Sequence, residues 1–351
     1  MKKRLIALSL LVLLLLALPV SGSAEAAGME KYSGYVFDAF DTTTTVTAYA
    51  ASAEEFNELL AGIEADLMHY HQLYDIYNPY EGLVNLYEVN LRAGKEPVEV
   101  PQEIMDILVF AKEMYAVTDG NMNVAFGSVL RIWHDVREYN NNFPNEDPIF
   151  PEREALEAAA EHCSIDDLIL DEEACTVFFA DPELKLDVGA IGKGYAVERV
   201  AQRLIAEGYD NILLNAGGNV RTIGGKLTGE NWVIGIQNPD TASSELYVAK
   251  ASVSGKAVIT SGVYQRFFEY EGKRYHHIID KDSLQPEDRY QSVTILLDDS
   301  GRGDALSTAV FNMPYEEGSA FVESLDGVEA MWILNDGTQC FSSGFEAYVI
   351  P

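Results

Sequence analysis

Helical and strand patterns follow one another irregularly along this chain, and no regular β-α-β repeat runs through it. A capping box, Ser52 with Glu55, opens a stretch of apolar residues at helical spacing that continues to about Tyr74. The other predicted helices begin at Pro101 (to Gly120), Pro151 (to His162), Tyr195 (to Ala206), Asp304 and Tyr315. The predicted strands lie at 31–50, 168–170, 177–179, 185–188 and 211–214, in an antiparallel meander at 231–270, and in a hairpin at 332–341. This mixture favours an α+β fold over a doubly wound parallel sheet.

The charge balance is strongly acidic, because 56 Asp and Glu residues stand against 24 Lys and Arg, for a formal charge of −32 at pH 7. Sequence-independent nucleic-acid binding needs a basic surface that neutralises phosphates, and docking on anionic lipid needs a basic patch. Neither class of partner fits this composition. With 48% hydrophobic residues, the 351-residue chain can bury a full core.

Residues 1–26 predict an export signal. Three cations at positions 2–4 precede an uncharged apolar run at 5–20, and Ala24-Glu25-Ala26 fits a cleavage site. The run is short for a membrane span, although retention as an uncleaved anchor is the alternative. No cysteine follows the run, so the sequence does not predict a lipoprotein. We therefore expect an exported, extracytoplasmic protein, at the cell surface or in the periplasm, with 27–351 as one functional domain.

Three cysteines, Cys163, Cys175 and Cys340, allow at most one internal disulfide. Cys163 and Cys175 flank a predicted turn, so they either pair or remain reduced. No Cys-x-x-Cys spacing, typical of metal and redox sites, occurs in the sequence.

A glycine-dense segment at 186–196 carries the first chemical signal. A predicted strand there passes through Gly189, Gly192 and Gly194 into a helix, and free N–H groups at a helix start suit phosphate binding. Lys193 adds a positive charge. The spacing matches neither a Walker A loop nor the dinucleotide fingerprint, so a tight turn with a helix-packing glycine is the alternative.

Paired glycines, Gly217 and Gly218, follow a second predicted strand and allow either a structural turn or contact with a ligand. Asp304 and Thr308 are four residues apart on one face of a predicted helix. A carboxylate with a hydroxyl is a hard oxygen set that suits Mg²⁺. The alternative for Asp304 is an acidic residue that the helix dipole favours near the N-terminus.

Two histidines, His276 and His277, are adjacent, and neighbouring residues on a strand point to opposite faces. At most one is therefore expected to enter a given site, where a histidine can serve as general base. For either one alone, a structural histidine with satisfied hydrogen bonds is the alternative. No zinc-binding spacing accompanies them, and the threonine run at 42–45 indicates β propensity.

Taken in order, these segments resemble the ApbE family, the FAD:protein FMN transferases. Each motif alone is weak, and their shared order makes the resemblance specific over residues 36 to 340. The matching segments are Phe40-Asp41-Thr42, Gly120 to Trp133, Asp187 to Ala196, Asn215 to Asn219, Thr260 to Arg266, His277 to Asp280 and Asp304 to Ala309.

The resemblance implies a single α+β unit related to the T-fold, with mixed sheets and helices and an FAD site in a cleft between two lobes. It also implies an activity: FAD is split with Mg²⁺, FMN is attached by a phosphoester bond to a Thr or Ser hydroxyl of a partner protein, and AMP is released. His277 would deprotonate that hydroxyl, which is a poor nucleophile until a base takes its proton. The backbone carbonyl of Ala190, together with Asp304 and Thr308, would hold Mg²⁺. The implied FAD contacts are Phe40, Asn121, Met122, Asn123, Asp187, Lys193, Gly217, Gly218 and Ile278.

Two positions depart from the family pattern. Asp41 places a carboxylate where the family commonly has glycine, so it either faces away from the site or assists the metal. Lys281 replaces a proline after His277, which frees the turn that follows the expected base.

Two other functions stay open at this point. An Mg²⁺-dependent FAD pyrophosphatase would use water in place of the acceptor hydroxyl, and an exported FAD-binding protein would not turn FAD over. Because export places the site outside the cytoplasmic membrane, the implied acceptors are extracytoplasmic FMN-binding domains, in Rnf- or Nqr-type complexes or in flavin-based extracellular electron transfer.

Overall fold

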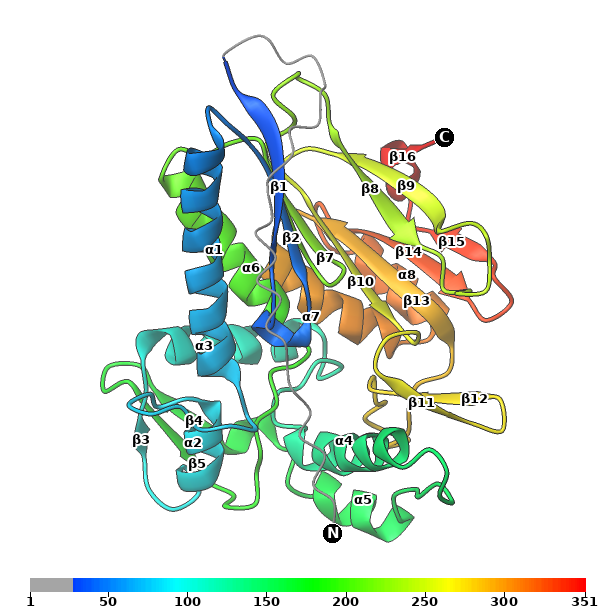
Figure 1. The fold of residues 1–351 in the computed structure, drawn as a ribbon. Helices are drawn as coiled ribbons and strands as arrows, with labels where there is room; N and C mark the ends of the chain where they lie inside the picture. Colours follow the sequence, from blue (N-terminus) through cyan, green and yellow to red (C-terminus); the bar gives the residue numbers. More distant parts are fainter. Residues whose placement is uncertain (1–27) are drawn as a thin grey trace, which may run out of the picture.

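A computed structural model describes residues 28–351, so the predicted export signal at 1–26 lies outside the described residues. An eight-stranded sheet forms the centre, and every neighbouring pair of its strands is antiparallel (Figure 1). In spatial order the strands are β1 (Glu30–Val36), β2 (Thr44–Ala50), β6 (Ile212–Ala216), β7 (Asn219–Ile223), β10 (Ala257–Gly262), β13 (Tyr290–Leu297), β14 (Glu329–Leu334) and β15 (Gln339–Phe341).

Helices cover one face of this sheet. α7 (Ser300–Phe311) lies against β10 and β13, α6 (Gly192–Ala206) lies against α7 and β7, and α1 (Ala53–Tyr74) packs beside α6, β1 and β2 (Figure 1). The predicted capping box is confirmed at the start of α1, because the Ser52 hydroxyl accepts the Glu55 N–H at 3.2 Å. α8 (Tyr315–Glu323) packs against β14 and α7.

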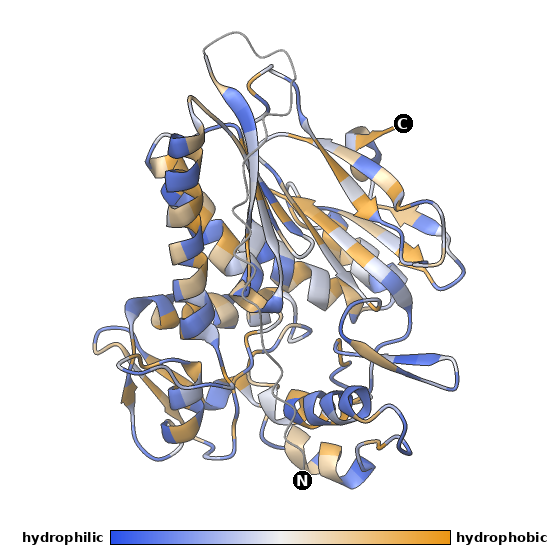
Figure 2. Cartoon of the chain, viewed as in Figure 1, coloured by the Kyte–Doolittle hydropathy of each residue, from blue (hydrophilic) through white to orange (hydrophobic). Residues whose placement is uncertain are grey.

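A second, three-stranded sheet covers the other face of the central sheet. It consists of β8 (Trp232–Gln237), β9 (Tyr247–Val253) and the C-terminal β16 (Val349–Ile350). Val258 and Leu296 pack toward this small sheet, whereas their neighbours Ile259 and Ile295 belong to the core cluster beneath α7. Because both faces are covered, seven of the eight β13 residues are buried, although Gln291, Ser292 and Thr294 are polar. Figure 2 shows hydrophobic stretches on the strands at the centre of the molecule.

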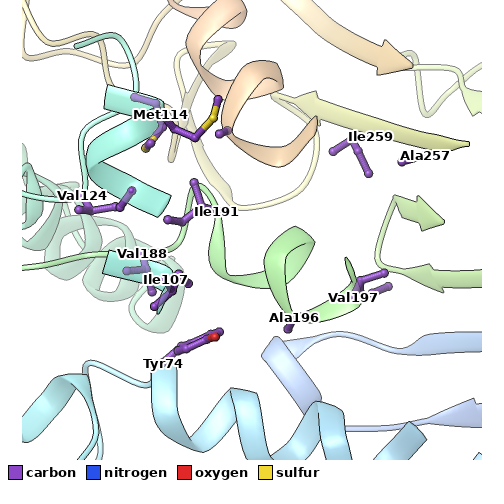
Figure 3. Close-up of a cluster of buried hydrophobic side chains, with 14 of the residues drawn as sticks. Tyr74, Ile107, Met114, Val124, Val188, Ile191, Ala196, Val197, Ala257 and Ile259 are labelled. Atoms are coloured by element: carbon purple, nitrogen blue, oxygen red, sulfur yellow. The ribbon is translucent and has the colours of Figure 1, made fainter. Parts of the chain in front are cut away.

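The main core joins elements that are far apart in the sequence. Tyr74 of α1, Ile107 and Met114 of α3 (Gln102–Val117) and Val197 of α6 lie in one cluster with Ile259 of β10 (Figure 3). Val188 and Ile191, which flank the segment expected to meet the substrate, are also buried there. The backbone at 188–191 is therefore anchored on both sides of Ala190.

Two smaller units lie at the lower end of the molecule in Figure 1. One contains α2 (Leu86–Arg92), α3, β3 (Val98–Glu99), β4 (Leu168–Asp171) and β5 (Thr176–Phe179). The other has its own apolar cluster and contains α4 (Gly127–Asn142), α5 (Arg153–Ala160) and the hairpin of β11 (Phe267–Tyr270) and β12 (Lys273–His276). Short 3₁₀ turns occur at Ala39–Asp41, Ile165–Asp167 and Phe345–Tyr348.

The predicted α+β class is confirmed, and several local predictions need correction. Residues 231–270 do not form a meander, because β10 leaves β9 and enters the central sheet between β7 and β13. Residues 185–188 form no strand beyond a single bridge between Lys185 and Phe126, since the partner segment turns into α4 at once. α6 begins at Gly192 and α7 at Ser300, both earlier than predicted, and α2 and α4 were not predicted.

The three described cysteines, Cys163, Cys175 and Cys340, are free, so the reduced alternative holds for Cys163 and Cys175. None of the helices within 28–351 combines the length and apolar character needed to cross a membrane.

Candidate active site

One cleft with a volume of about 510 Å³ collects residues from almost every predicted motif. All the predicted site residues except Gly218 line it: Phe40, Asn121, Met122, Asn123, Asp187, Ala190, Lys193, Gly217, His277, Ile278, Asp304 and Thr308. Gly218 lies just outside, where its N–H donates to the Asn215 side chain at 3.1 Å. We name two sides of the cleft: the α7 wall (Lys193, Asp304, Thr308, Asn312) and the α4 wall (Tyr77, Leu130, Trp133, His134, Arg137).

The α7 wall depends on a close approach of α6 to α7. A Cβ atom at Gly194 would lie 2.4 Å from the Ser300 carbonyl oxygen and 2.5 Å from Cβ of Asp304, so only glycine fits. The Gly194 N–H donates to Oδ2 of Asp304 at 2.8 Å. Burial raises the pKa of the Asp304 carboxyl, while Lys193 and the Gly194 hydrogen bond act in the opposite direction.

Behind this wall, a buried ion pair joins α6, β7 and α7. Arg221 donates to Glu198 through Nε at 2.8 Å and through Nη2 at 3.2 Å. Glu198 also accepts the Ser300 N–H at 2.8 Å, which holds the first residue of α7. The Arg221 side chain is 5% exposed and the Glu198 side chain is 6% exposed. This buried pair therefore forms a rigid support for α7, the helix that carries Asp304.

The glycine pair motif contacts the glycine-dense motif across the cleft. The Lys193 ammonium donates to the Gly217 carbonyl oxygen at 3.3 Å. Gly217 has φ of 54°, and a Cβ there would lie 2.3 Å from Oγ1 of Thr42. The left-handed conformation and the close approach both require glycine. Burial lowers the pKa of Lys193, whereas Asp304 raises it.

Asp187 begins the loop that leads into α6. Its Oδ1 accepts the Gly189 N–H at 2.7 Å, and its own N–H donates to the Val124 carbonyl oxygen at 2.8 Å. The loop is thus fixed to the 121–126 segment by backbone contacts. Burial raises the pKa of the Asp187 carboxyl, and the Gly189 hydrogen bond and the charge of Arg266 lower it.

The segment that carries Phe40 has a strained backbone. Asp38, Phe40 and Asp41 all have positive φ, at 67°, 57° and 54°. The Phe40 N–H donates to Nδ1 of His71 at 3.2 Å, and its carbonyl oxygen accepts Nη2 of Arg266 at 3.3 Å. Such strain persists only where the surroundings hold it, and it is common at ligand sites. Asp41 also lines the cleft, on the same strained segment.

Residues 121–123 form a compact turn after α3. The Met122 N–H donates to the Thr118 hydroxyl at 3.1 Å, and Met122 itself is buried. The Asn123 side chain donates to the Cys163 carbonyl oxygen at 2.9 Å and accepts the Ala125 N–H at 2.9 Å. The amide of Asn123 therefore has structural partners on both ends, although the residue lines the cleft.

The two adjacent histidines separate into different roles. His276 is buried, with Nε2 2.6 Å from the Glu287 carbonyl oxygen and Nδ1 accepting the Ile278 N–H at 3.2 Å, and burial lowers its pKa to about 4. His277 points into the cleft, where its Nδ1 is buried without a hydrogen-bond partner in residues 28–351. Burial, followed by the charge of Arg266, holds the pKa of His277 well below its usual range. His277 is thus neutral at neutral pH and able to accept a proton.

The turn after His277 is closed without the family's proline. Oδ1 of Asp280 accepts the Ser283 N–H at 2.6 Å and the Asp282 N–H at 3.2 Å. The Leu284 carbonyl oxygen at its end accepts the indole N–H of Trp133 at 2.9 Å. Lys281 therefore does not free this turn, because Asp280 and α4 hold it.

The α4 wall contains residues that the sequence did not mark as functional. Arg137 and His134 are one turn apart on α4, and Nη2 of Arg137 lies 3.1 Å from Nδ1 of His134. The Tyr77 ring stacks on the His134 ring with centroids 4.6 Å apart. In the sequence, these residues would have been marked by the polar face of α4. That face could not be recognised, because the helix itself was not predicted. Asn312 was also missed, although it continues the four-residue spacing of Asp304 and Thr308.

No group of three or more His, Cys, Asp or Glu side chains within 28–351 could hold a metal ion. The residues predicted for Mg²⁺ are instead one carboxylate, one hydroxyl and one backbone carbonyl, all at the cleft. This donor set fits the ion, since Mg²⁺ prefers hard oxygen ligands and commonly takes one or two carboxylates with substrate phosphates and water. Oδ1 of Asn312, buried without a partner among the described residues, supplies a further free oxygen on the same helix face.

A family model described as the ApbE family matches residues 40–332. The chain belongs to the ApbE family. The resemblance that the motifs predicted is thereby confirmed. The match includes every predicted site residue and both walls of the cleft.

Sequence relatives and solved structures agree with this family. A protein named FAD:protein FMN transferase from Klebsiella pneumoniae (strain 342) is 34% identical over 257 residues, which is 73% of this chain and 77% of the relative. Another of that name from Treponema pallidum (strain Nichols) is 31% identical over 270 residues, covering 73% of this chain and 72% of its own. These names agree with the predicted class of enzyme, a transferase.

The fold agrees with two solved ApbE structures. The ApbE protein from Thermotoga maritima MSB8 superposes with a TM-score of 0.79 at 27% identity, covering 92% of this chain and 100% of that one. The flavin transferase ApbE from Vibrio cholerae superposes with a TM-score of 0.75 at 25% identity, covering 91% and 99%. The predicted ApbE-like mixture of sheets and helices is therefore confirmed.

Proposed function

We propose that this chain is an Mg²⁺-dependent FAD:protein FMN transferase that modifies a Thr or Ser hydroxyl of an extracytoplasmic flavoprotein. One observation carries the proposal. A single cleft brings the oxygens of Asp304, Thr308 and Ala190 together with the cations Lys193 and Arg266 and the neutral imidazole of His277. Hard oxygen ligands, positive charge and a proton acceptor are the components that phosphoryl-group transfer needs.

In the proposed reaction, the acceptor hydroxyl attacks the phosphorus atom nearest the flavin. A phosphoester bond forms, the P–O bond of the diphosphate breaks, and AMP leaves with the bridging oxygen. His277 takes the hydroxyl proton, because its imidazole is neutral and its Nδ1 has no partner within residues 28–351. A phosphate placed beside His277 raises the pKa of the imidazole toward neutrality and makes it a stronger base.

The side chains of the α7 wall bind and orient the diphosphate. Lys193 faces it with an amine whose pKa is lowered by burial and raised by the charge of Asp304. Asp304, Thr308 and the Ala190 carbonyl would hold Mg²⁺, which, when bound, neutralises phosphate charge and polarises the scissile bond. Asp304 is pre-oriented for this role by the Gly194 N–H.

The test is incubation of the mature protein with FAD, Mg²⁺ and a recombinant FMN-binding domain, followed by the intact mass of the acceptor. The proposal expects a gain of one FMN less water on a Thr or Ser. His277→Ala should lower the rate by about 10²–10⁴-fold, as loss of a general base does, and Asp304→Asn by about a hundredfold or more. Asp298→Asn is the matched control, because that carboxylate is 76% exposed and pairs with Lys256.

An unmodified acceptor with free FMN and AMP in solution would instead identify an FAD pyrophosphatase. Intact FAD with every acceptor, at an FAD concentration that saturates the protein, would identify a binding protein without turnover. The acceptors to try are extracytoplasmic FMN-binding domains, of Rnf- or Nqr-type complexes or of extracellular electron transfer. This choice rests on the export signal read at 1–26, and secretion of a full-length fusion into the extracytoplasmic space tests it.

A further inference from the structure

Three cations face the cleft without forming an ion pair inside the described part of the chain. Lys193, Arg137 and Arg266 line the cleft, and none of them has a carboxylate oxygen within ion-pair distance among residues 28–351. This is notable in a chain with 56 acidic and 24 basic residues, where carboxylates are abundant. Lys193 and Arg266 belong to motifs already discussed, whereas nothing so far explains Arg137.

Arg137 is held in place rather than mobile. Its Nη2 atom lies 3.1 Å from Nδ1 of His134, and the Tyr77 hydroxyl lies 3.3 Å from that same nitrogen. A guanidinium can only donate, so Nδ1 of His134 must carry a lone pair and the imidazole must be neutral. Burial and the charge of Arg137 both lower the pKa of His134, which agrees with this state.

The charge of Arg137 is poorly compensated inside the protein. Burial lowers the pKa of Arg137 and the charge of Arg266 lowers it further, and these effects outweigh those of Tyr77, Glu138 and Asp187, which raise it. The same two arginines appear together among the charges that depress the pKa of His277. Converging positive charges in a partly buried site cost free energy unless an anion binds between them.

Resting on the proposed function, we propose that Arg137 binds the phosphate groups of the flavin nucleotide from the α4 wall, with His134 as its positioning residue. A guanidinium offers a planar fork of donors that matches phosphate oxygens bidentately, which a lysine does not. The diphosphate then lies between the oxygens of the α7 wall and this arginine. Arg137 also faces Asp187, but burial raises the pKa of that carboxyl and no ion pair joins the two.

The experiment compares flavins that carry phosphate groups with one that carries none. Dissociation constants of FAD, FMN and riboflavin are measured by quenching of flavin fluorescence, in EDTA, for the unsubstituted protein and for Arg137→Gln. Loss of a charge-assisted phosphate contact should raise the dissociation constants of FAD and FMN about tenfold or more. The dissociation constant of riboflavin, which has no phosphate, should change less than about twofold. The matched control is Arg92→Gln on α2, because Arg92 pairs with Glu96, is 43% exposed and does not line the cleft.

Equal weakening of the binding of all three flavins, or no weakening for any of them, would overturn the assignment of Arg137 to phosphate binding. Arg137→Lys retains the charge without the fork and should recover only part of the loss, and it replaces Arg137→Gln if that variant fails to fold. Calorimetric titration with inorganic pyrophosphate provides a readout without flavin, and Arg137→Gln should weaken it by a similar factor. Failure of transfer by an unsubstituted protein that still binds FAD through its phosphates would refute the proposed function and leave this inference standing.

Discussion

The α7 wall is fixed by deep burial, whereas the α4 wall is held by half-exposed aromatic and polar contacts. Asp304 lies 7% exposed on a helix whose approach to α6 admits only glycine at position 194. Tyr77 on the α4 wall is 40% exposed, and its ring rests on His134. The first wall presents oxygen atoms together with the Lys193 ammonium, and the second presents the Arg137 guanidinium to the same cleft.

This difference separates two tasks of a group-transfer site. Under the proposed function, oxygen ligands of a metal ion would have to keep their geometry to a fraction of an ångström, which agrees with their buried and tightly packed support. The opposite wall would have to admit FAD and then an acceptor protein, which agrees with the 40% exposure of Tyr77. We expect substitutions behind the α7 wall to cost stability and substitutions on the α4 wall to change mainly ligand binding.

The largest expected loss of stability comes from Arg221→Met, behind the α7 wall. It leaves the Glu198 carboxylate buried without its cation, and breaking a buried pair costs about 3–5 kcal/mol. Urea unfolding followed by circular dichroism measures the change in the free energy of unfolding. The double variant with Glu198→Met removes both charges and should recover most of the loss. A loss below 1 kcal/mol, no larger than that of the exposed pair variant Arg131→Met, would contradict the rigid-support view.

A second prediction concerns the glycine contact between α6 and α7. Gly194→Ala places a Cβ atom 2.4 Å from the Ser300 carbonyl oxygen, so the helices must separate, at a cost of about 3 kcal/mol. Transfer activity should fall as well, because Asp304 loses its alignment with Gly194. Gly62→Ala is the matched helical glycine: its nearest neighbour atom is 3.8 Å away, and the substitution should stabilise α1 by about 0.5–1 kcal/mol. Equal effects at the two positions would show that helix propensity, and not packing, decides.

A third prediction uses pH at His276, the last residue of β12. The pKa of His276 is about 4 in the folded state, below the ordinary value of 6.5, so the unfolded state binds the proton more tightly. Stability should therefore fall as pH drops from about 6.5 to about 4, by up to about 3 kcal/mol, and level off below that range. We would measure the free energy of unfolding at pH 7, 6, 5 and 4 for the unsubstituted protein and for His276→Gln. The difference between the two proteins at each pH gives the contribution of His276 to stability.

The control for that pH series is His162→Gln. The hydrogen bond that His162 donates to the Asp181 carboxylate raises the pKa of His162, so its contribution is present at low pH and is lost as pH rises through the raised pKa. The difference between the unsubstituted protein and His162→Gln should change with pH in the opposite direction. A pH-independent difference for His276→Gln would mean that this histidine is not buried in its neutral form.

The sequence predicted the α7 wall far better than the α4 wall. Asp304 and Thr308, Lys193, and His277 with its neighbour were marked by local spacing and by the family motifs, and the structure places them at one cleft. Local spacing is informative there because the residues lie on single helices or directly beside glycines. The start of α7 was placed too late, because its N-cap Asp299 precedes two glycines, Gly301 and Gly303, that read as a loop.

The sequence did not predict the α4 wall, because this wall depends on contacts between residues that are distant in the chain. The segment 127–142 begins without a side-chain cap and ends in three asparagines, so its helical signal is weak. Its role depends on Tyr77 and on the turn held by Asp280, which are distant in the chain. The β10 crossover was missed for a similar reason, since alternation predicts strands and not their partners.

The smallest expected change in stability is on the α4 wall. Tyr77→Leu removes the ring that stacks on His134, and a half-exposed aromatic pair contributes about 1 kcal/mol. The same change frees His134, so the contact that positions Arg137 weakens and the KM for FAD should rise severalfold with little change in kcat. Tyr77→Phe keeps the stacked ring and should lose only the contribution of the hydroxyl near Nδ1 of His134. If Tyr77→Leu costs as much stability as Arg221→Met, the α4 wall is as rigid as the α7 wall, and the division of tasks between them is wrong.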